Sequence, residues 1–362
     1  AVRSKKKYYI EQYTNAYPFH PDFIDVLQTN WVQIETFQRT RGVLRTITLA
    51  LRDSRSWDDS PMIGPRALLT TAKGGGINGG GLDLIEAAEH DQDDTKKAAW
   101  GAILHKELEI ASEIEKGEGL DDAEIQQSVL ATFLYSQPVG RTARFADLRR
   151  MVMPTKAKRM NYDDGMVKWL ESSWYLDEKY ARVEQGERLP STWRIGSKPN
   201  LNQLHHEAKR TMSPEKITSY LSKEVDKCNR LTDGVRASQV QSHIQPKTPA
   251  DVADDGKFRL VILEPGETSS KGNPSELAVR FMEEASSPGR KFRNAVMVVS
   301  TAPDGWERMR MSALNILAWR QVEDDLRNGP DDDEDRISEV RDKVKEAERE
   351  LPNRILNAYA NV

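Results

Sequence analysis

The chain has almost no cysteine and no long apolar run. Cys228 is the only cysteine among 362 residues, which excludes an intrachain disulfide and a metal site built from several cysteines. No stretch approaches the roughly 18 consecutive apolar residues of a membrane-spanning helix. The first residues, AVRSKKKYYIEQYTNAYPFHP, contain no apolar core of a secretory signal. We therefore expect a cytoplasmic chain that has no membrane partner.

Motifs for nucleotide hydrolysis and metal-dependent chemistry are also missing. The stretch GGGINGGG around Ile77 lacks the Lys and Ser or Thr that complete a phosphate-binding loop, and no apolar strand precedes it. Its composition predicts a flexible, glycine-rich insertion over residues 72–82. The six histidines form no HExxH pair. The sequence therefore predicts no catalytic residue, no metal site and no cofactor for the isolated chain.

Charge is nearly balanced over the whole chain but not along it. Lys and Arg number 53 against 57 Asp and Glu, a formal net charge of -4. Residues 141–160, however, carry seven basic side chains and one acidic one, Asp147. A local excess of this kind is typical either of a surface that faces a polyanion or of a solvated helix face.

Hydrophobic periodicity predicts a mainly α, multidomain chain. Apolar residues recur at helical spacing through residues 1–136, which we expect to form a helical domain. Residues 137–231 change character and predict a winged-helix module with further helices after it. The polar stretch 232–256 reads as a linker. Residues 257–362 predict a small α/β unit, strand–helix–strand, closed by two long helices.

The winged-helix prediction depends on the order of four elements. Helices are expected over about 145–153 and 162–176, followed by strands over 180–184 and 192–195 that form a hairpin. The second helix, which would be the recognition helix, is more acidic than basic, so reading of bases in the major groove is disfavoured. We expect weak, salt-sensitive contacts to DNA phosphates; the alternative is a module that binds only protein. The predicted nucleic-acid contacts are Arg149, Arg150, Lys156, Lys158, Arg159, Arg182 and Arg194.

A second arginine cluster lies near the start of the chain. Arg39, Arg41 and Arg45 fall within seven residues around Gly42. On one helix Arg41 and Arg45 are four positions apart and share a face. Guanidinium groups gathered on one face match a phosphate or carboxylate partner. The alternative is a set of salt bridges to acidic residues of the chain, such as Glu35 or Asp53.

Residues 17–52 carry a family resemblance. The strings YPFHPDFIDVL and FQRTRGVLR resemble large prokaryotic ATPases related to AAA+ and Orc/Cdc6-like enzymes, of the phage-defence-island type. These include BREX-like ATPases and ATPases encoded beside DNA methyltransferases. The resemblance implies that 1–136 is a helical AAA+ lid, and that Gly42-Val-Leu-Arg45 is its Gly-x-x-Arg signature. Arg45 would then be the sensor 2 arginine that reaches the γ-phosphate of ATP, with Arg41 and Arg39 as its neighbours in cofactor binding.

The chain departs from this family because both Walker motifs are missing. The resemblance therefore implies a non-catalytic, C-terminal portion of a DNA-directed ATPase, whose nucleotide-binding core, with ATP and Mg, lies in an absent N-terminal part. That core is the first expected partner. DNA and defence proteins such as a methyltransferase or a helicase are the others. The alternatives are a free-standing winged-helix DNA-binding regulator and a protein-interaction scaffold.

Overall fold

A computed structural model describes residues 2–90, 98–152, 159–236, 238, 240–286, 289–329 and 333–360. The chain is mainly helical, as predicted, and its sheets have only two or three strands. It divides into two compact units, residues 1–203 and 204–362. No helix in the described ranges has the length and apolar character needed to cross a membrane.

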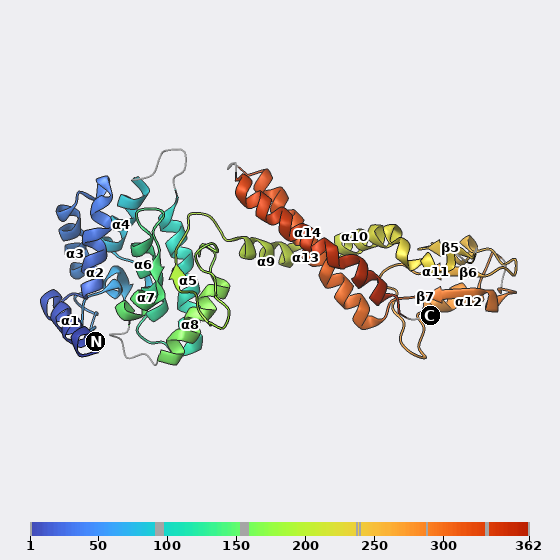
Figure 1. Cartoon of the computed structure of the whole chain (residues 1–362), viewed down its shortest axis with the longest axis horizontal. Coiled ribbons are helices and arrows are strands. Elements are labelled where there is room, and N and C mark those ends of the chain that lie inside the picture. Colours follow the sequence, from blue (N-terminus) through green and yellow to red (C-terminus); the bar gives the residue numbers. More distant parts are fainter. Residues whose placement is uncertain are drawn as a thin grey trace. The chain divides into compact units, whose positions relative to one another are not determined.

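Unit 1 is built from helices around one buried helix, α6 (Figure 1). Almost every residue of α6 is buried, as expected for a helix that is covered on all sides. Phe133 of α6 lies between Trp31 and Trp100, with ring centroids 5.6 and 5.4 Å away. The elements are α1 (Val2–Ala16), α2 (Pro21–Thr29), α3 (Thr40–Ser54), β1 (Leu69–Thr71), β2 (Gly74–Ile77), α4 (Gly79–His90), α5 (Trp100–Glu118), α6 (Glu124–Ser136), β3 (Ala143–Arg144), α7 (Phe145–Val152), α8 (Arg159–Ser172) and β4 (Thr192–Trp193).

The core of unit 1 continues across the expected boundary between residues 136 and 137. A single cluster of buried apolar side chains runs from Phe23 to Ile195. The chain divides instead between residues 203 and 204, inside α9 (Leu201–Thr211). The helices of 1–136 and the segment 137–195 therefore share one hydrophobic core.

The hairpin expected after the two helices of 137–176 differs from the prediction. β3 pairs antiparallel with β4, and Leu176 forms an antiparallel bridge with Ile195. The expected strand at 180–184 does not form, and 177–191 is the loop between Leu176 and β4. Leu176 and Ile195 are both buried, whereas Val183 is 45% exposed. The alternating apolar and polar residues at 180–184 therefore lie in a solvent-exposed loop. The buried Leu176 takes their place as the partner of Ile195.

The glycine-rich stretch forms regular structure, which corrects the expectation of a flexible insertion over 72–82. β1 pairs antiparallel with β2, and α4 begins at Gly79. Gly74 has a φ of +84°, and a Cβ at this position would lie 2.0 Å from Oε1 of Gln126 on α6. The turn is thus packed against the central helix, at a distance that only glycine permits.

A buried carboxylate connects α5 to the end of α8. Glu107 is fully buried and accepts hydrogen bonds from Nε1 of Trp169 (2.6 Å) and Oγ of Ser173 (2.9 Å). It also accepts the backbone N–H groups of Trp174 (2.8 Å) and Tyr175 (2.9 Å). Burial raises the pKa of Glu107, and these hydrogen bonds oppose that rise. The carboxylate satisfies the donors that the chain leaves unpaired where it departs from α8.

Unit 2 is an α/β unit with two long helices, α13 and α14, that pack side by side (Figure 1). Its sheet has the strand order β5-β6-β7, all parallel. Helices α10, α13 and α14 cover one face, while α12 lies against β7 on the other. The elements are α10 (Pro214–Lys227), α11 (Asp233–Arg236), β5 (Gln241–Ile244), β6 (Arg259–Ile262), α12 (Glu276–Glu283), β7 (Val296–Val299), α13 (Pro303–Arg327) and α14 (Glu334–Ala358).

The stretch 232–256 differs from the expected linker because it contributes a strand to unit 2. β5 lies in this stretch and pairs in parallel with β6, with Gln241 opposite Arg259 and Ile244 opposite Ile262. As an edge strand, β5 is only partly buried, so polar residues are tolerated there. Its sequence therefore lacks the apolar run that reveals β6.

Candidate anion-binding pocket

The start of α3 is held against the preceding turn by a glycine. Gln38 and Arg39 have φ values of 57° and 52°, a region that residues other than glycine rarely adopt. One turn later, a Cβ on Gly42 would lie 1.7 Å from the carbonyl oxygen of Phe37. Gly42 is therefore required for the close approach that directs α3 past Phe37.

Helix α4 packs closely along α3 because its first turn is also made of glycine. A Cβ on Gly80 would lie 2.8 Å from both the Cβ of Ala50 and the carbonyl oxygen of Thr46. The amide groups of this turn are satisfied by the protein itself. Oδ1 of Asn78 accepts the N–H groups of Gly80 (3.0 Å) and Gly81 (3.3 Å). These two donors are therefore engaged within the protein.

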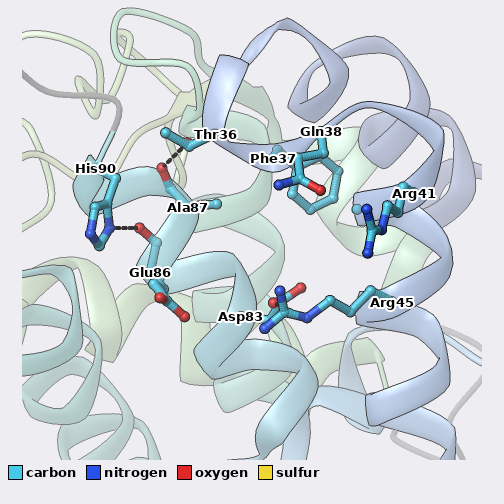
Figure 2. Close-up of a pocket in the computed structure, with 10 residues that line it drawn as sticks. Thr36, Phe37, Gln38, Arg41, Arg45, Asp83, Glu86, Ala87 and His90 are labelled. Atoms are coloured by element: carbon cyan, nitrogen blue, oxygen red, sulfur yellow. Dashed lines mark hydrogen bonds and ion pairs between the residues drawn. The ribbon is translucent and has the colours of Figure 1, made fainter.

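A pocket of about 430 Å³ opens between α3 and α4. Arg41 and Arg45 project into it from α3, and Asp83, Glu86 and His90 from α4 (Figure 2). The pocket thus has a guanidinium wall and a wall of oxygen and imidazole groups. Its other lining residues are Thr36, Phe37, Gln38, Gly42 and Ala87.

Arg45 is paired across the pocket. Its Nε lies 3.0 Å from Oδ1 of Asp83, and the Arg45 side chain is 64% exposed while that of Asp83 is 9% exposed. The other carboxylate oxygen, Oδ2, accepts a hydrogen bond from the hydroxyl of Thr46 at 2.7 Å. Arg45 therefore forms a salt bridge within the chain, which is the alternative interpretation of the arginine cluster, and its partner is Asp83. Asp53 pairs instead with Arg52, at 2.7 Å.

Arg41 and Arg39 differ from Arg45 and from each other. Arg41 lines the pocket, is exposed, and has no ion pair with any residue in the described ranges. Arg39 is also exposed, but it is outside the lining of the pocket. Of the three predicted cofactor-binding arginines, the structure thus brings two to one pocket.

The α4 wall was missed by the sequence reasoning. Nδ1 of His90 lies 2.7 Å from the carbonyl oxygen of Glu86, and because a carbonyl oxygen only accepts, Nδ1 must carry a proton and donate. Nε2 is then the ring nitrogen left for another partner. Asp83, Glu86 and His90 are spaced three and four residues apart, which places them on one face of α4. That spacing is readable in the sequence, but nothing there indicates that the face lies opposite α3.

Most of the predicted nucleic-acid contacts are engaged within the protein. Arg149 lies 2.8 Å from Oδ1 of Asp163 and stacks over Phe145 at 4.5 Å. Arg150 pairs with Asp22 and with Asp147, at 2.5 and 3.0 Å. A phosphate contact by these arginines would have to compete with carboxylates that already satisfy them.

The other five predicted contacts fall into three groups. Arg194 is mostly buried, 3.6 Å from Asp177. Arg159 is 72% exposed and only 3.8 Å from Asp163, and Arg182 is exposed with its Nε donating to the carbonyl of Glu178 (3.3 Å). Lys156 and Lys158 lie outside the described residues.

Charged side chains of the expected recognition helix, α8, likewise form ion pairs with neighbouring residues of the protein. Lys168 pairs with Glu118, and Asp164 with Arg188, both at 2.5 Å.

Within the part of the chain that the structure describes, no group of three or more His, Cys, Asp or Glu residues could hold a metal ion. The pocket between α3 and α4 is therefore the strongest candidate site.

Comparison with known families gives one match. Residues 2–72, about a fifth of the chain, match the family model described as DUF499 second domain. Comparison with curated proteins and with solved structures finds no match. The matched segment includes α3 and the whole of 17–52, and so contains the arginine wall of the pocket.

Proposed function

We propose that residues 1–136 are the lid part of a DNA-directed AAA+-type ATPase of the phage-defence-island type, and that Arg45 and Arg41 contact the phosphates of ATP bound to a separate nucleotide-binding core. The observation that carries this proposal is the pocket between α3 and α4. Two arginines of one helix face the same space there, and Arg41 has no ion pair among the described residues.

The chemistry of the arginine wall suits a phosphate group. Guanidinium groups donate in a planar fork that matches phosphate oxygens. Arg45 uses Nε toward Asp83, so its two Nη groups remain as donors. Such donors act on charge that develops in the transition state of phosphoryl transfer, and their loss mainly raises the barrier.

The family match supports the same proposal. The DUF499 second-domain match covers residues 2–72, which include the strings that resemble lids of BREX-like ATPases. In this proposal Gly42 to Arg45 is the Gly-x-x-Arg signature. The requirement for Gly42 beside Phe37 gives that glycine a physical reason.

The other parts of the proposal concern partners. The nucleotide-binding core supplies the Mg and ATP sites, because the motifs for them are missing here. The winged helix contacts DNA phosphates weakly, and a methyltransferase or helicase of the same defence system is a further partner. We place the protein in the cytoplasm, because a chain with a single cysteine fits a reducing compartment.

ATP hydrolysis tests the proposal. The isolated chain is expected to release no phosphate from Mg-ATP. When the chain is joined to its nucleotide-binding core, Arg45→Ala should lower kcat by about 100- to 1000-fold, with a smaller change in KM. Arg55→Ala is the matched control, because Arg55 is exposed at the other end of α3 and outside the pocket.

Two results would contradict the proposal. One is ATP turnover by the isolated chain that persists through further purification. The other is an Arg45→Ala protein that loses thermal stability but keeps the wild-type turnover per folded molecule, which would make the ion pair with Asp83 purely structural.

A second candidate function is protein binding through the winged helix. It is favoured by the pairing of Arg149, Arg150 and Lys168 with carboxylates of unit 1. A module whose cations are already neutralised offers little to a phosphate backbone. A free-standing winged-helix regulator, by contrast, requires DNA binding by the chain alone, and a DNA titration separates the two.

A further inference from the structure

We propose that Asp83 is a positioning residue that orients the Arg45 guanidinium toward an anion in the pocket. This inference rests on the proposed function, because it concerns the same arginine. It adds a residue outside the matched segment 2–72 and assigns it a role that neither the family match nor the arginine motif contains.

Both oxygens of the Asp83 carboxylate are used. Oδ1 lies 3.0 Å from Nε of Arg45, and Oδ2 accepts the Thr46 hydroxyl at 2.7 Å. Thr46 is fully buried, so its hydroxyl fixes the position of the Asp83 carboxylate. Contact at Nε fixes one edge of the guanidinium plane and leaves N–H groups of both Nη atoms as donors for another partner.

The backbone of α4 makes this contact possible. Gly80 lies against Ala50 and Thr46 at a distance that excludes any side chain, and Asn78 caps the first turn. Asp83 is one turn further along α4, so the same close packing brings its short side chain within reach of α3. The glycine-rich turn therefore serves to place a carboxylate beside Arg45.

Ordering a free arginine side chain for binding costs free energy, and an arginine that is already oriented avoids most of that cost. Arg41 has no such support among the described residues. The negative charge of Asp83, however, also repels an incoming anion. The two effects predict opposite results for a neutral residue at position 83, so one substitution decides between them.

The experiment is a titration of this chain with inorganic pyrophosphate, followed by NMR signals of the arginine Nε–H groups. Asp83→Asn keeps an oxygen that can accept the Thr46 hydroxyl but removes the charge that holds Arg45. We expect pyrophosphate to bind about three- to tenfold more weakly. We also expect the Arg45 Nε–H to exchange faster with water in the free variant.

Glu86→Gln is the matched control. Glu86 lines the same pocket from the same helix and is exposed, so this variant removes one negative charge without touching the Arg45 pair. We expect it to bind pyrophosphate more tightly than the wild type. Thermal unfolding of both variants establishes that they are folded under the titration conditions.

The outcomes separate this inference from the proposed function. Tighter or unchanged binding by Asp83→Asn, together with loss of binding in Arg45→Ala, overturns the positioning role alone. A wild-type chain whose Arg41 and Arg45 signals do not respond to pyrophosphate overturns the phosphate-binding role of the pocket and the inference with it. Opposite shifts in affinity for Asp83→Asn and Glu86→Gln support both.

Discussion

The carboxylate of Glu115 on α5 binds Gln126 on α6 twice, accepting its backbone N–H at 2.8 Å and its side-chain amide at 2.6 Å. Oε1 of Gln126 in turn accepts the N–H of Gly75 at 3.1 Å. The glycine-rich hairpin, the central helix and α5 are thus joined through one acidic residue that is only 5% exposed. The protonation of that residue should be visible in the stability of the protein.

Burial raises the pKa of Glu115 from its ordinary value of 4.5 to about 7. Below pH 4.5 the group is protonated in both the folded and the unfolded chain. Between 4.5 and 7 it ionises mainly in the unfolded chain, so the free energy of unfolding falls as pH rises, by about 3 kcal/mol in total. Glu115→Gln should remove this loss. Denaturant unfolding between pH 4.5 and 8 measures it.

The control for this prediction is Glu113→Gln on the same helix. Glu113 is exposed and pairs only with Lys116 among the described residues. Its substitution removes a carboxylate from α5 without removing a contact to Gln126, so it is the reference for the loss of one charge from this helix. Parallel pH profiles for the wild type and Glu115→Gln would show that Glu115 ionises normally in the folded protein.

Removal of the buried Glu107 carboxylate should be strongly destabilising. Glu107→Ala removes the carboxylate that accepts from the Trp169 indole, the Ser173 hydroxyl and two backbone N–H groups. We expect the free energy of unfolding to fall by about 4 kcal/mol. Glu109→Ala changes an exposed residue of the same helix and should cost less than about 0.5 kcal/mol. Urea unfolding followed by tryptophan fluorescence compares them, and equal midpoints would refute the structural role of Glu107.

The close approach at Gly42 makes a prediction about two glycines. Gly42→Ala forces a Cβ against the Phe37 carbonyl and should destabilise the chain by about 3 kcal/mol. Gly117→Ala, in α5 with nothing within 4 Å of the new methyl group, should instead stabilise it by about 0.5–1 kcal/mol. Calorimetric melting temperatures are the measurement. Stabilisation by both substitutions would mean that α3 does not pass close to Phe37.

Exposed and paired arginines should differ in DNA binding. Arg159→Ala and Arg182→Ala should each weaken binding to any duplex and reduce the salt slope by about one. Arg149→Ala, which breaks the pair with Asp163, should mainly lower stability. Titration of labelled duplexes at two salt concentrations tests this. Absence of binding at low salt would favour protein interaction as the role of the predicted winged-helix module.

Some features of this protein follow from the sequence alone because they depend on local periodicity. Apolar residues at helical spacing predict the mainly helical fold, and the run at 258–263 predicts β6. Arg41 and Arg45 share a helix face because they are four residues apart. The missing phosphate-loop residues are equally local information.

Only the tertiary structure determined which residues and strands contact one another. The sequence does not reveal that Asp83 meets Arg45, that Leu176 rather than 180–184 pairs with Ile195, or that β5 joins β6. Each of these pairs joins segments that are distant in the chain. Many acidic residues, apolar residues and strand edges have equal local propensity, and burial and packing determine which of them come together. The glycine-rich stretch shows the reason most clearly. Its composition permits a flexible loop, but without side chains it also permits the close contact with α3 and α6 that the folded core imposes.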